Sequence, residues 1–258
     1  MPYYLKNIIL LVITVSFFTG CVSIKKENVQ EMFQSNNAVE IKSDYKKISK
    51  LVIRLKEKLD KRNPRAYDEN LASKIYTEID NLQDTVNLKF KNNEVSSYKS
   101  YLQIAFSKDD IKNRNDYLIL GLYKNIYDAY DMSSSYKITA FSYDKEKLLK
   151  LYNNLQILAW KIKVEKDLSN NYLFLTWQNN WQIELEKKVK AGLKPTWKDF
   201  ENLAFIKNGQ ESIFGYSNLS FEHILLQMKA RVGTTLERLG TEPTQMSLNT
   251  IKSLFIFL

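Results

Sequence analysis

The segment DKEKLLKLYNNLQILAWKIKVEK, Asp144 to Lys166, carries the strongest helical pattern in the chain. Its apolar residues recur three or four positions apart, which places them on one face of an α-helix. They are Leu148, Leu151, Tyr152, Leu155, Leu158, Ala159 and Ile162. Ile157, Trp160 and Val164 widen this apolar face, so the segment predicts a helix buried at the centre of the fold.

The same spacing recurs through most of the chain and predicts a mainly α fold, an irregular multi-helix bundle of antiparallel helices. Glycine and proline are scarce, at 7 and 4 residues, whereas sheet proteins with many tight turns usually need more of both. Residues 136–143 are the one place where we expect a short extended piece. Gly121 lies within a predicted helix, and we expect another helix to cross closely there. The further helices are expected at residues 43–63, 71–86, 94–106, 109–132, 172–190, 196–206 and 220–239, with a last one after Pro243.

A short apolar run near the start of the chain ends in Phe18-Thr19-Gly20-Cys21. Lys6 precedes the apolar residues 8–18, and small residues lead to the only cysteine, which is the order of a secretory signal peptide. The stretch resembles the lipobox of bacterial lipoproteins. The resemblance implies that residues 1–20 are removed as a signal peptide and that Cys21 is acylated, with palmitate as a measurable label. Two alternatives are a transmembrane anchor, for which the run is short against a hydrocarbon core of about 30 Å, and an ordinary buried thiol.

Residues 21–42 are polar without a sustained period, so we expect a flexible tether there and a single helical domain at residues 43–258. By resemblance to enterobacterial lipoproteins, Val22 in place of an aspartate implies the outer membrane, facing the periplasm, over the inner membrane. These features predict a membrane-anchored lipoprotein of the cell envelope that acts by binding or assembly, without catalysis. Its partners would be the lipid bilayer, through Cys21, and envelope proteins or peptidoglycan.

The composition excludes several kinds of chemistry. With one histidine and one cysteine in the chain, a zinc site built from His and Cys ligands, an internal disulfide and a cysteine nucleophile with a histidine base are all out of reach. The glycines are isolated, so no phosphate-binding loop is expected, and neither a metal nor a cofactor is predicted.

The formal net charge of +9 comes from lysines that are scattered through the predicted helices. Such a surface either attracts anionic lipid head groups or nucleic acid, or it only solvates the protein. An exported protein rarely meets nucleic acid, so we expect no nucleic-acid partner. Lys58, Lys61, Arg62 and Arg65 cluster at one helix end, where they either touch acidic envelope polymers or are simply solvated.

The densest group of candidate binding residues lies at residues 177–184. Two tryptophans four positions apart stack on one face of a helix, beside amide side chains. Aromatic faces next to amides suit sugar rings, which points to a glycan such as peptidoglycan; the alternative is that the tryptophans are core residues. The candidates are Trp177, Gln178, Asn180, Trp181, Gln182 and Glu184.

A second candidate is the loop-like segment 209–218, with Glu222 and His223 beyond it. Glu211-Ser212 is similar to the catalytic dipeptide of lytic transglycosylases, helical enzymes in which a glutamate is the general acid. That resemblance implies the alternative function, glycan cleavage by Glu211, although the Gly-Leu-Met-Gln segment of that family is missing downstream. Ser212 or Ser217 as a nucleophile, with His223 as its base, is a further option; the alternative is a polar loop with a hydrogen-bonded histidine.

Two more features carry structural expectations. Arg114-Asn115-Asp116 places Asn115 on an apolar helix stripe, which indicates either a buried polar network or part of a cleft. The apolar tail Leu254–Leu258 is too short to span a bilayer. We expect the tail to dock into the core of the domain or to be buried against a partner.

Overall fold

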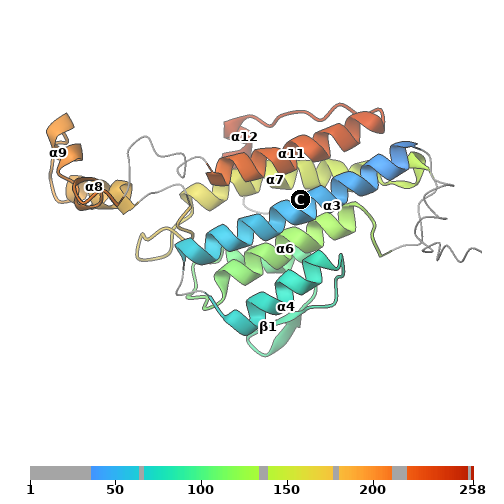
Figure 1. Ribbon diagram of the computed structural model, residues 1–258, viewed down its shortest axis with the longest axis horizontal. Helices are drawn as coiled ribbons and strands as arrows, with labels where there is room; N and C mark the ends of the chain where they lie inside the picture. The colour runs from blue at the N-terminus through green and yellow to red at the C-terminus, as the bar shows by residue number, and fades with distance from the viewer. Residues whose placement is uncertain (1–35, 64–66, 134–138, 177–179, 211–219, 255–256) are drawn as a thin grey trace, which may run out of the picture.

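The structure is a computed structural model of the chain, and it describes residues 36–63, 67–133, 139–176, 180–210, 220–254 and 257–258. Within these residues the protein is mainly helical, as the apolar spacing predicts, with one short two-stranded sheet. The long helices lie side by side along the longest axis of the molecule (Figure 1). They are α3 (Asn36–Arg62), α6 (Arg114–Ala129), α7 (Lys145–Val164) and α11 (Ser220–Arg238).

These helices form a closed ring. α3 packs against α6 and α11, and α7 packs against the same two helices, so that α3 is diagonal to α7. Tyr45 hydrogen-bonds Tyr123 at 3.1 Å, whereas Lys56, further along α3, meets Asp116, which comes earlier on α6. This crossed order is that of antiparallel neighbours, and the contacts of α11 with α3 and α7 follow it too. The prediction of an antiparallel helical bundle is therefore confirmed.

α7 holds the central place that its sequence predicts. Asp144 caps its first turn by accepting hydrogen bonds from the backbone N–H groups of Glu146 and Lys147. Its apolar side chains are part of one continuous hydrophobic core. Burying such side chains is the main favourable contribution to folding. The core includes Tyr45, Ile48, Val52, Leu118, Leu122, Leu151, Leu155, Leu158, Met228 and Val232.

α3 begins at Asn36, not at Ser43, which corrects the predicted boundary between tether and domain. Ala38 and Ile41 are fully buried, so the first turns of α3 already belong to the core. Asp44 was expected near the start of the helix, but it lies inside α3 and pairs with Arg231 at 3.5 Å and with Arg238. The rest of the predicted tether, residues 21–35, lies outside the described residues.

A β-hairpin lies between the second and third predicted helices, and it takes the first two residues of the third, which was expected at residues 94–106. α4 (Glu69–Asp80) stops early because Glu78 accepts a hydrogen bond from the N–H of Val86 at 2.8 Å, which folds the chain back. β1 (Leu88–Phe90) and β2 (Asn93–Val95) then pair antiparallel through a two-residue turn, Lys91-Asn92, in which both residues have positive φ. The strands were not predicted here. Of the expected extended piece at 136–143, residues 140–142 form a 3-10 turn and residues 134–138 lie outside the described part.

The predicted close crossing at Gly121 is confirmed. α5 (Tyr98–Ala105) packs on α6 at this glycine. A Cβ atom built there would lie 2.9 Å from Cβ of Tyr101 and 3.0 Å from two side-chain carbons of Leu102. Only glycine therefore allows this separation of the two helices.

We expect Gly121→Ala to lower the free energy of unfolding by about 1–3 kcal/mol, because the methyl group forces α5 away from α6. Gly233→Ala on α11 is the matched control. A Cβ there would meet its nearest neighbours at 3.5 and 3.6 Å, ordinary contact distances. Alanine at Gly233 should therefore be neutral or stabilising by up to about 1 kcal/mol, from helix propensity alone. Urea denaturation compares the two; equal stabilities would show that the crossing at Gly121 does not restrict side-chain size.

The segment that follows α7 leaves the bundle. α8 (Asn180–Lys190), α9 (Trp197–Glu201) and α10 (Ala204–Lys207) project beyond one end of the long helices (Figure 1). The helix predicted from residue 172 begins only at Asn180, because Tyr172 instead forms a β-bridge with Lys166. After α11, α12 (Leu248–Ser253) packs on α7.

None of the helices in the described ranges is both long and apolar enough to cross a lipid bilayer. The predicted anchor segment, residues 8–18, and Cys21 lie outside these ranges.

Candidate functional site

Several of the predicted site residues lie outside the described part of the chain. They are Cys21, Trp177, Gln178 and Glu211, together with both serines that were considered as nucleophiles. Asn180 is described only as the first residue of α8. The structure therefore does not bring Glu211 into, or keep it out of, any site.

Trp181 is a packing residue. Its side chain is 8% exposed, and its ring lies 6.1 Å from that of Phe200, centroid to centroid. Glu184 accepts hydrogen bonds from the N–H of Ala204 at 2.8 and 3.0 Å and pairs with Lys188 at 2.8 Å, so that it ties α8 to α10. Gln182 is half-buried. For Trp181 the structure favours packing over a sugar-binding platform.

His223 is exposed on α11, and its Nε2 atom lies 2.7 Å from Nε2 of Gln227, one turn further along. The histidine is therefore hydrogen-bonded within the helix, while residues 211–219 of the loop before it lie outside the described part of the chain. Its neighbour Glu222 faces another way, across to Lys163 of α7, at 3.5 Å.

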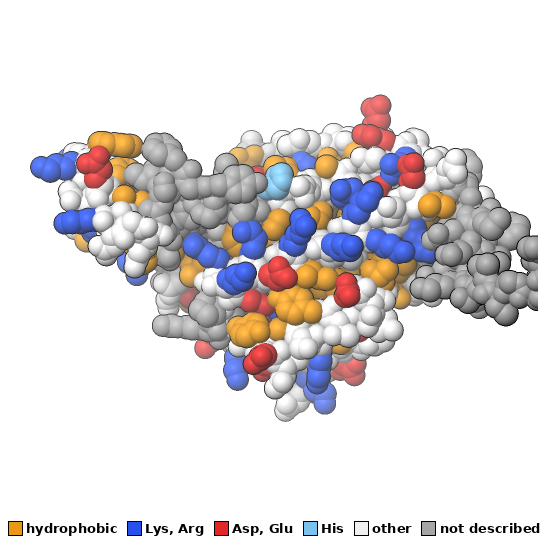
Figure 2. Space-filling view, in the orientation of Figure 1, with side chains coloured by type: hydrophobic (Ala, Val, Ile, Leu, Met, Phe, Trp, Pro, Cys, Tyr) orange, Lys and Arg blue, Asp and Glu red, His pale blue; other side chains and the backbone are white. Residues whose placement is uncertain are grey.

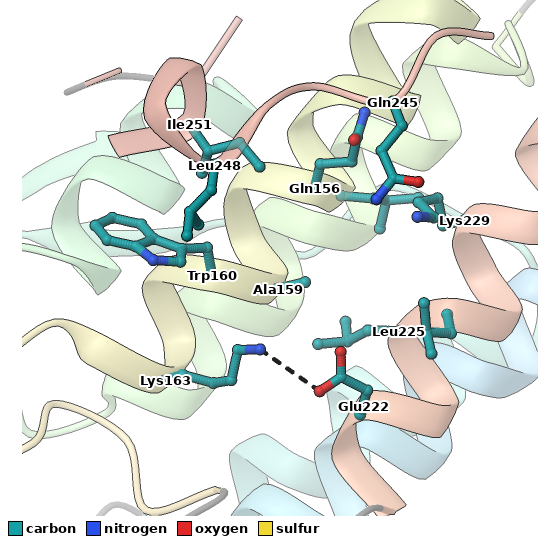
Figure 3. Close-up of a pocket in the computed structure, with 12 residues that line it drawn as sticks. Gln156, Ala159, Trp160, Lys163, Glu222, Leu225, Lys229, Gln245, Leu248 and Ile251 are labelled. Atoms are coloured by element: carbon teal, nitrogen blue, oxygen red, sulfur yellow. Dashed lines mark hydrogen bonds and ion pairs between the residues drawn. The ribbon is translucent and has the colours of Figure 1, made fainter. Parts of the chain in front are cut away.

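That ion pair forms one wall of a pocket between α7, α11 and the segment leading into α12 (Figure 3). We call it the α7–α11 pocket; its volume is about 220 Å³. Trp160 and Gln156 line it from α7, and Leu248 of α12 lies next to the ring of Trp160 (Figure 3). The complete lining is Leu155, Gln156, Ala159, Trp160, Lys163, Glu222, Leu225, Leu226, Lys229, Gln245, Leu248 and Ile251.

The α7–α11 pocket has an apolar floor and a polar rim. Leu155, Leu225 and Ile251 are buried beneath it, while Leu226 and Leu248 are 47% and 53% exposed beside it. Large apolar side chains that stay this exposed around one hollow are typical of a place where another molecule binds.

The polar rim of the α7–α11 pocket is held in place by hydrogen bonds. Gln156 accepts a hydrogen bond from the N–H of Met246 at 2.8 Å and donates one to Asn153 at 3.2 Å, which fixes the segment before α12. Lys229 lies with its ammonium 6.0 Å from the ring of Tyr152. The rim is therefore preformed.

Sequence reasoning missed this pocket. Its residues come from three separate parts of the chain, and Leu155, Ala159 and Trp160 of α7 were assigned to an apolar helix face. Only Glu222 stood near a predicted candidate. One feature of the sequence could have indicated the pocket. At Trp160 the apolar face of the helix is wider than the neighbouring helices can cover.

The polar network predicted around Asn115 and Asp116 is confirmed and buried. The ammonium of Lys56 lies 2.9 Å from Asp60 and 2.5 Å from Asp116, and the amide of Asn115 donates to Asp60 at 3.1 Å. Tyr76 donates to the same aspartate at 3.3 Å. None of Lys56, Asp60, Asn115 and Asp116 is more than 7% exposed. Arg114 lies apart from them and donates to backbone oxygens at the end of α5, including that of Ala105 at 2.7 Å.

Asp116 is the most perturbed acid of this network. Burial raises the pKa of Asp116 from 3.8 to about 6, although nearby Lys56 lowers it. Its Oδ2 atom has no hydrogen-bond partner in the described residues. The network joins α3 to α6, and on the side of Asp60 and Tyr76 it borders a surface pocket of about 230 Å³.

The fold and the pocket together define a helical-bundle protein with a preformed surface pocket. No protein-family model, curated protein or solved structure matches the chain.

Proposed function

We propose that the protein is a lipid-anchored component of the bacterial cell envelope that acts by binding a partner protein, without catalysis. The anchor is the acylated Cys21, supported by the lipobox-like Phe18-Thr19-Gly20-Cys21. Val22 favours the outer membrane, on its periplasmic side, over the inner membrane. The partner binds at the α7–α11 pocket.

The observation that carries this proposal is the pair of exposed leucines, Leu226 and Leu248, in the lining of a pocket that also includes Trp160. Partner proteins bind through a few large side chains that enter pockets of this kind. The volume of about 220 Å³ lies below the roughly 300–1,000 Å³ of pockets that enclose drug-sized ligands. It suits one or two apolar side chains of a partner, and Lys229 on the rim favours an acidic residue next to them.

The alternative is peptidoglycan binding or glycan cleavage by Glu211. It rests on the Glu211-Ser212 dipeptide alone, because Trp181 is buried and no described residue adds to a glycan site. Peptidoglycan digestion by the purified protein that is abolished in Glu211→Gln would establish this alternative in place of ours.

The anchor is tested by metabolic labelling. The wild-type protein should incorporate labelled palmitate and sediment with membranes, whereas Cys21→Ser should do neither. A Cys21→Ser protein that is labelled as strongly as the wild type would remove the lipoprotein part of the proposal.

The pocket is tested by photo-crosslinking in intact cells. A crosslinking amino acid at Leu248 should capture one partner, and Leu226→Asp in the same chain should reduce the capture at least about tenfold, because hot-spot contacts are worth about 2 kcal/mol or more. Leu168→Asp is the matched control, since Leu168 is 82% exposed and lies outside the pocket. Equal capture by all three chains would show that the pocket does not bind the partner.

A further inference from the structure

The outer face of α3 is strongly basic. Its cations at positions 47, 50, 54, 58 and 61 are three or four residues apart and so form one stripe along the helix. Lys58 is half-exposed and the other four are exposed. In the space-filling view a row of Lys and Arg side chains follows the band that α3 occupies in Figure 1 (Figure 2). We call Lys47, Lys50, Arg54, Lys58 and Lys61 the α3 basic face.

Few acids neutralise this face. In the described parts of the chain, Lys47, Lys50, Arg54 and Lys61 form no ion pair, whereas some lysines on other helices do, as Lys147 does with Asp128 at 2.8 Å. Two of the four acids of α3, Asp44 and Asp60, are buried; Glu40 pairs with Arg238, and Glu57 is the exposed acid within the stretch.

The stripe is also crowded with like charges at one end. Partial burial lowers the pKa of Lys58, and the positive charges of Lys61 and Arg62 lower it further. A neighbouring anion would relieve this repulsion. The electrostatic energy of these cations is therefore lower next to a negatively charged surface than in water.

The shape of this face selects the kind of anion. From position 47 to position 61 the stripe is about 21 Å long at 1.5 Å per residue, and it lies on the convex surface of one helix. A small anion would contact only one or two of these side chains. An extended anionic surface contacts all of them.

The membrane is the anionic surface within reach. α3 is the first described helix after Cys21, and residues 21–35 span at most about 50 Å when extended. We propose that the α3 basic face lies on anionic phospholipid head groups, with the bundle axis parallel to the membrane; this inference rests on the proposed lipid anchor. Since α7 is diagonal to α3, the α7–α11 pocket then faces away from the lipid and stays accessible to a partner.

The test uses the processed chain, residues 21–258, with Cys21→Ser, which carries no acyl group. It should sediment with vesicles of one part phosphatidylglycerol to three parts phosphatidylcholine, and it should bind pure phosphatidylcholine far more weakly. Each cation near such a surface contributes about a fivefold factor in affinity. Lys47→Glu/Lys50→Glu/Arg54→Glu should therefore weaken binding about a hundredfold, and 0.5 M salt should weaken binding of the unaltered chain too.

The matched control, Lys74→Glu/Lys99→Glu/Lys150→Glu, makes the same change in net charge at exposed lysines of α4, α5 and α7. It should keep its affinity within about threefold, since interactions beyond the Debye length of about 10 Å are largely screened. Melting curves establish that both triple variants fold. Equal losses in the two triples, no preference for anionic vesicles, or tighter binding to a soluble nucleic acid than to the vesicles would each overturn the inference.

The two proposals fail separately. Palmitate labelling of the wild-type protein does not depend on the α3 basic face, and vesicle binding by the Cys21→Ser chain does not depend on acylation. If the wild-type protein is labelled but the Cys21→Ser chain does not bind anionic vesicles, the proposed anchor stands and the proposed contact of the α3 basic face with the membrane fails.

Discussion

Replacing Lys56 with methionine should lower the free energy of unfolding by about 3–5 kcal/mol, because it leaves two buried carboxylates without their cation. Lys56 is 1% exposed and contacts both Asp60 and Asp116. Methionine has a similar length and fills most of the same space, so the loss reports on charge more than on packing. Against a typical domain stability of about 5–15 kcal/mol, this is one of the largest effects expected from a single substitution.

The pH dependence identifies the cause. The pKa of Asp116 in the folded protein, about 6, lies above its ordinary value of 3.8, so its contribution to stability is present at low pH and is lost as the pH rises through about 6. Removing Lys56 removes a positive charge that lowers this pKa, which should rise further. The penalty of Lys56→Met should therefore be largest near pH 8 and shrink towards pH 5.

Denaturant unfolding of the wild type and of Lys56→Met at pH 5 and pH 8 measures both effects. Lys46→Met, at an exposed lysine of the same helix, is the control and should change stability by less than about 0.5 kcal/mol at either pH. A penalty for Lys56→Met that is the same at both pH values would show that lost packing, and not unpaired charge, is responsible.

Most of the bundle was predictable from the sequence because helix periodicity is a local signal. The helix expected at residues 144–166 is α7 (Lys145–Val164), and the stripe that begins at Ser220 is α11. Each apolar face extends over several turns, so single polar residues do not hide the period. Gly121 was informative for the same reason, since a glycine inside such a pattern weakens the helix and needs a tertiary explanation.

The β-hairpin could not be predicted in this way. Its strands are three residues each, too short for an alternating pattern, and the Lys91-Asn92 turn lacks the glycine typical of such turns. Its hydrogen bonds to the helices are non-local: the N–H of Leu88 donates to the hydroxyl of Tyr101 at 2.6 Å, and the hydroxyl of Tyr117 donates to the backbone oxygen of Lys89 at 2.7 Å. The hairpin therefore depends on contacts that exist only after the helices pack.

The same distinction applies to the candidate sites. Asn115 indicated a buried network because it is polar on an apolar stripe, but the cation of that network, Lys56, lies 60 residues before its partner Asp116, in a helix rich in lysine. In the local sequence, Lys56 differs from the exposed cations of the α3 basic face only in the side of the helix on which it lies. The α7–α11 pocket was hidden for a similar reason, since it exists only where two apolar stripes and the segment before α12 leave a gap.

Deleting residues 253–258, or replacing Phe257 alone with alanine, should destabilise the protein strongly, because the end of the described chain is part of the core. Phe257 is 4% exposed, and its ring lies 5.5 Å from that of Phe106. Leu258 donates its N–H to Asn154 at 2.7 Å, and its backbone oxygen accepts from Tyr98 at 2.7 Å. The tail thus joins α5 to α7, which are far apart in the sequence.

Truncating a buried phenylalanine usually lowers the free energy of unfolding by about 3–5 kcal/mol, through lost transfer energy and the cavity that is left. For a domain of this size, that corresponds to a fall of about 6–20 °C in melting temperature. Leu248→Ala is the control for a tail-proximal apolar residue, since Leu248 is 53% exposed, and it should shift the melting temperature by only about 2 °C.

The two variants also separate the tail from the α7–α11 pocket. Phe257→Ala should lower the melting temperature and leave partner capture intact at temperatures where the protein is folded, because Phe257 does not line the pocket. Leu248→Ala should leave the melt nearly unchanged and weaken capture by a crosslinking amino acid that is placed at Leu226 for this comparison. An unchanged melt for Phe257→Ala together with a lost partner would mean that the tail is an interaction surface and that Phe257 contributes no core stability.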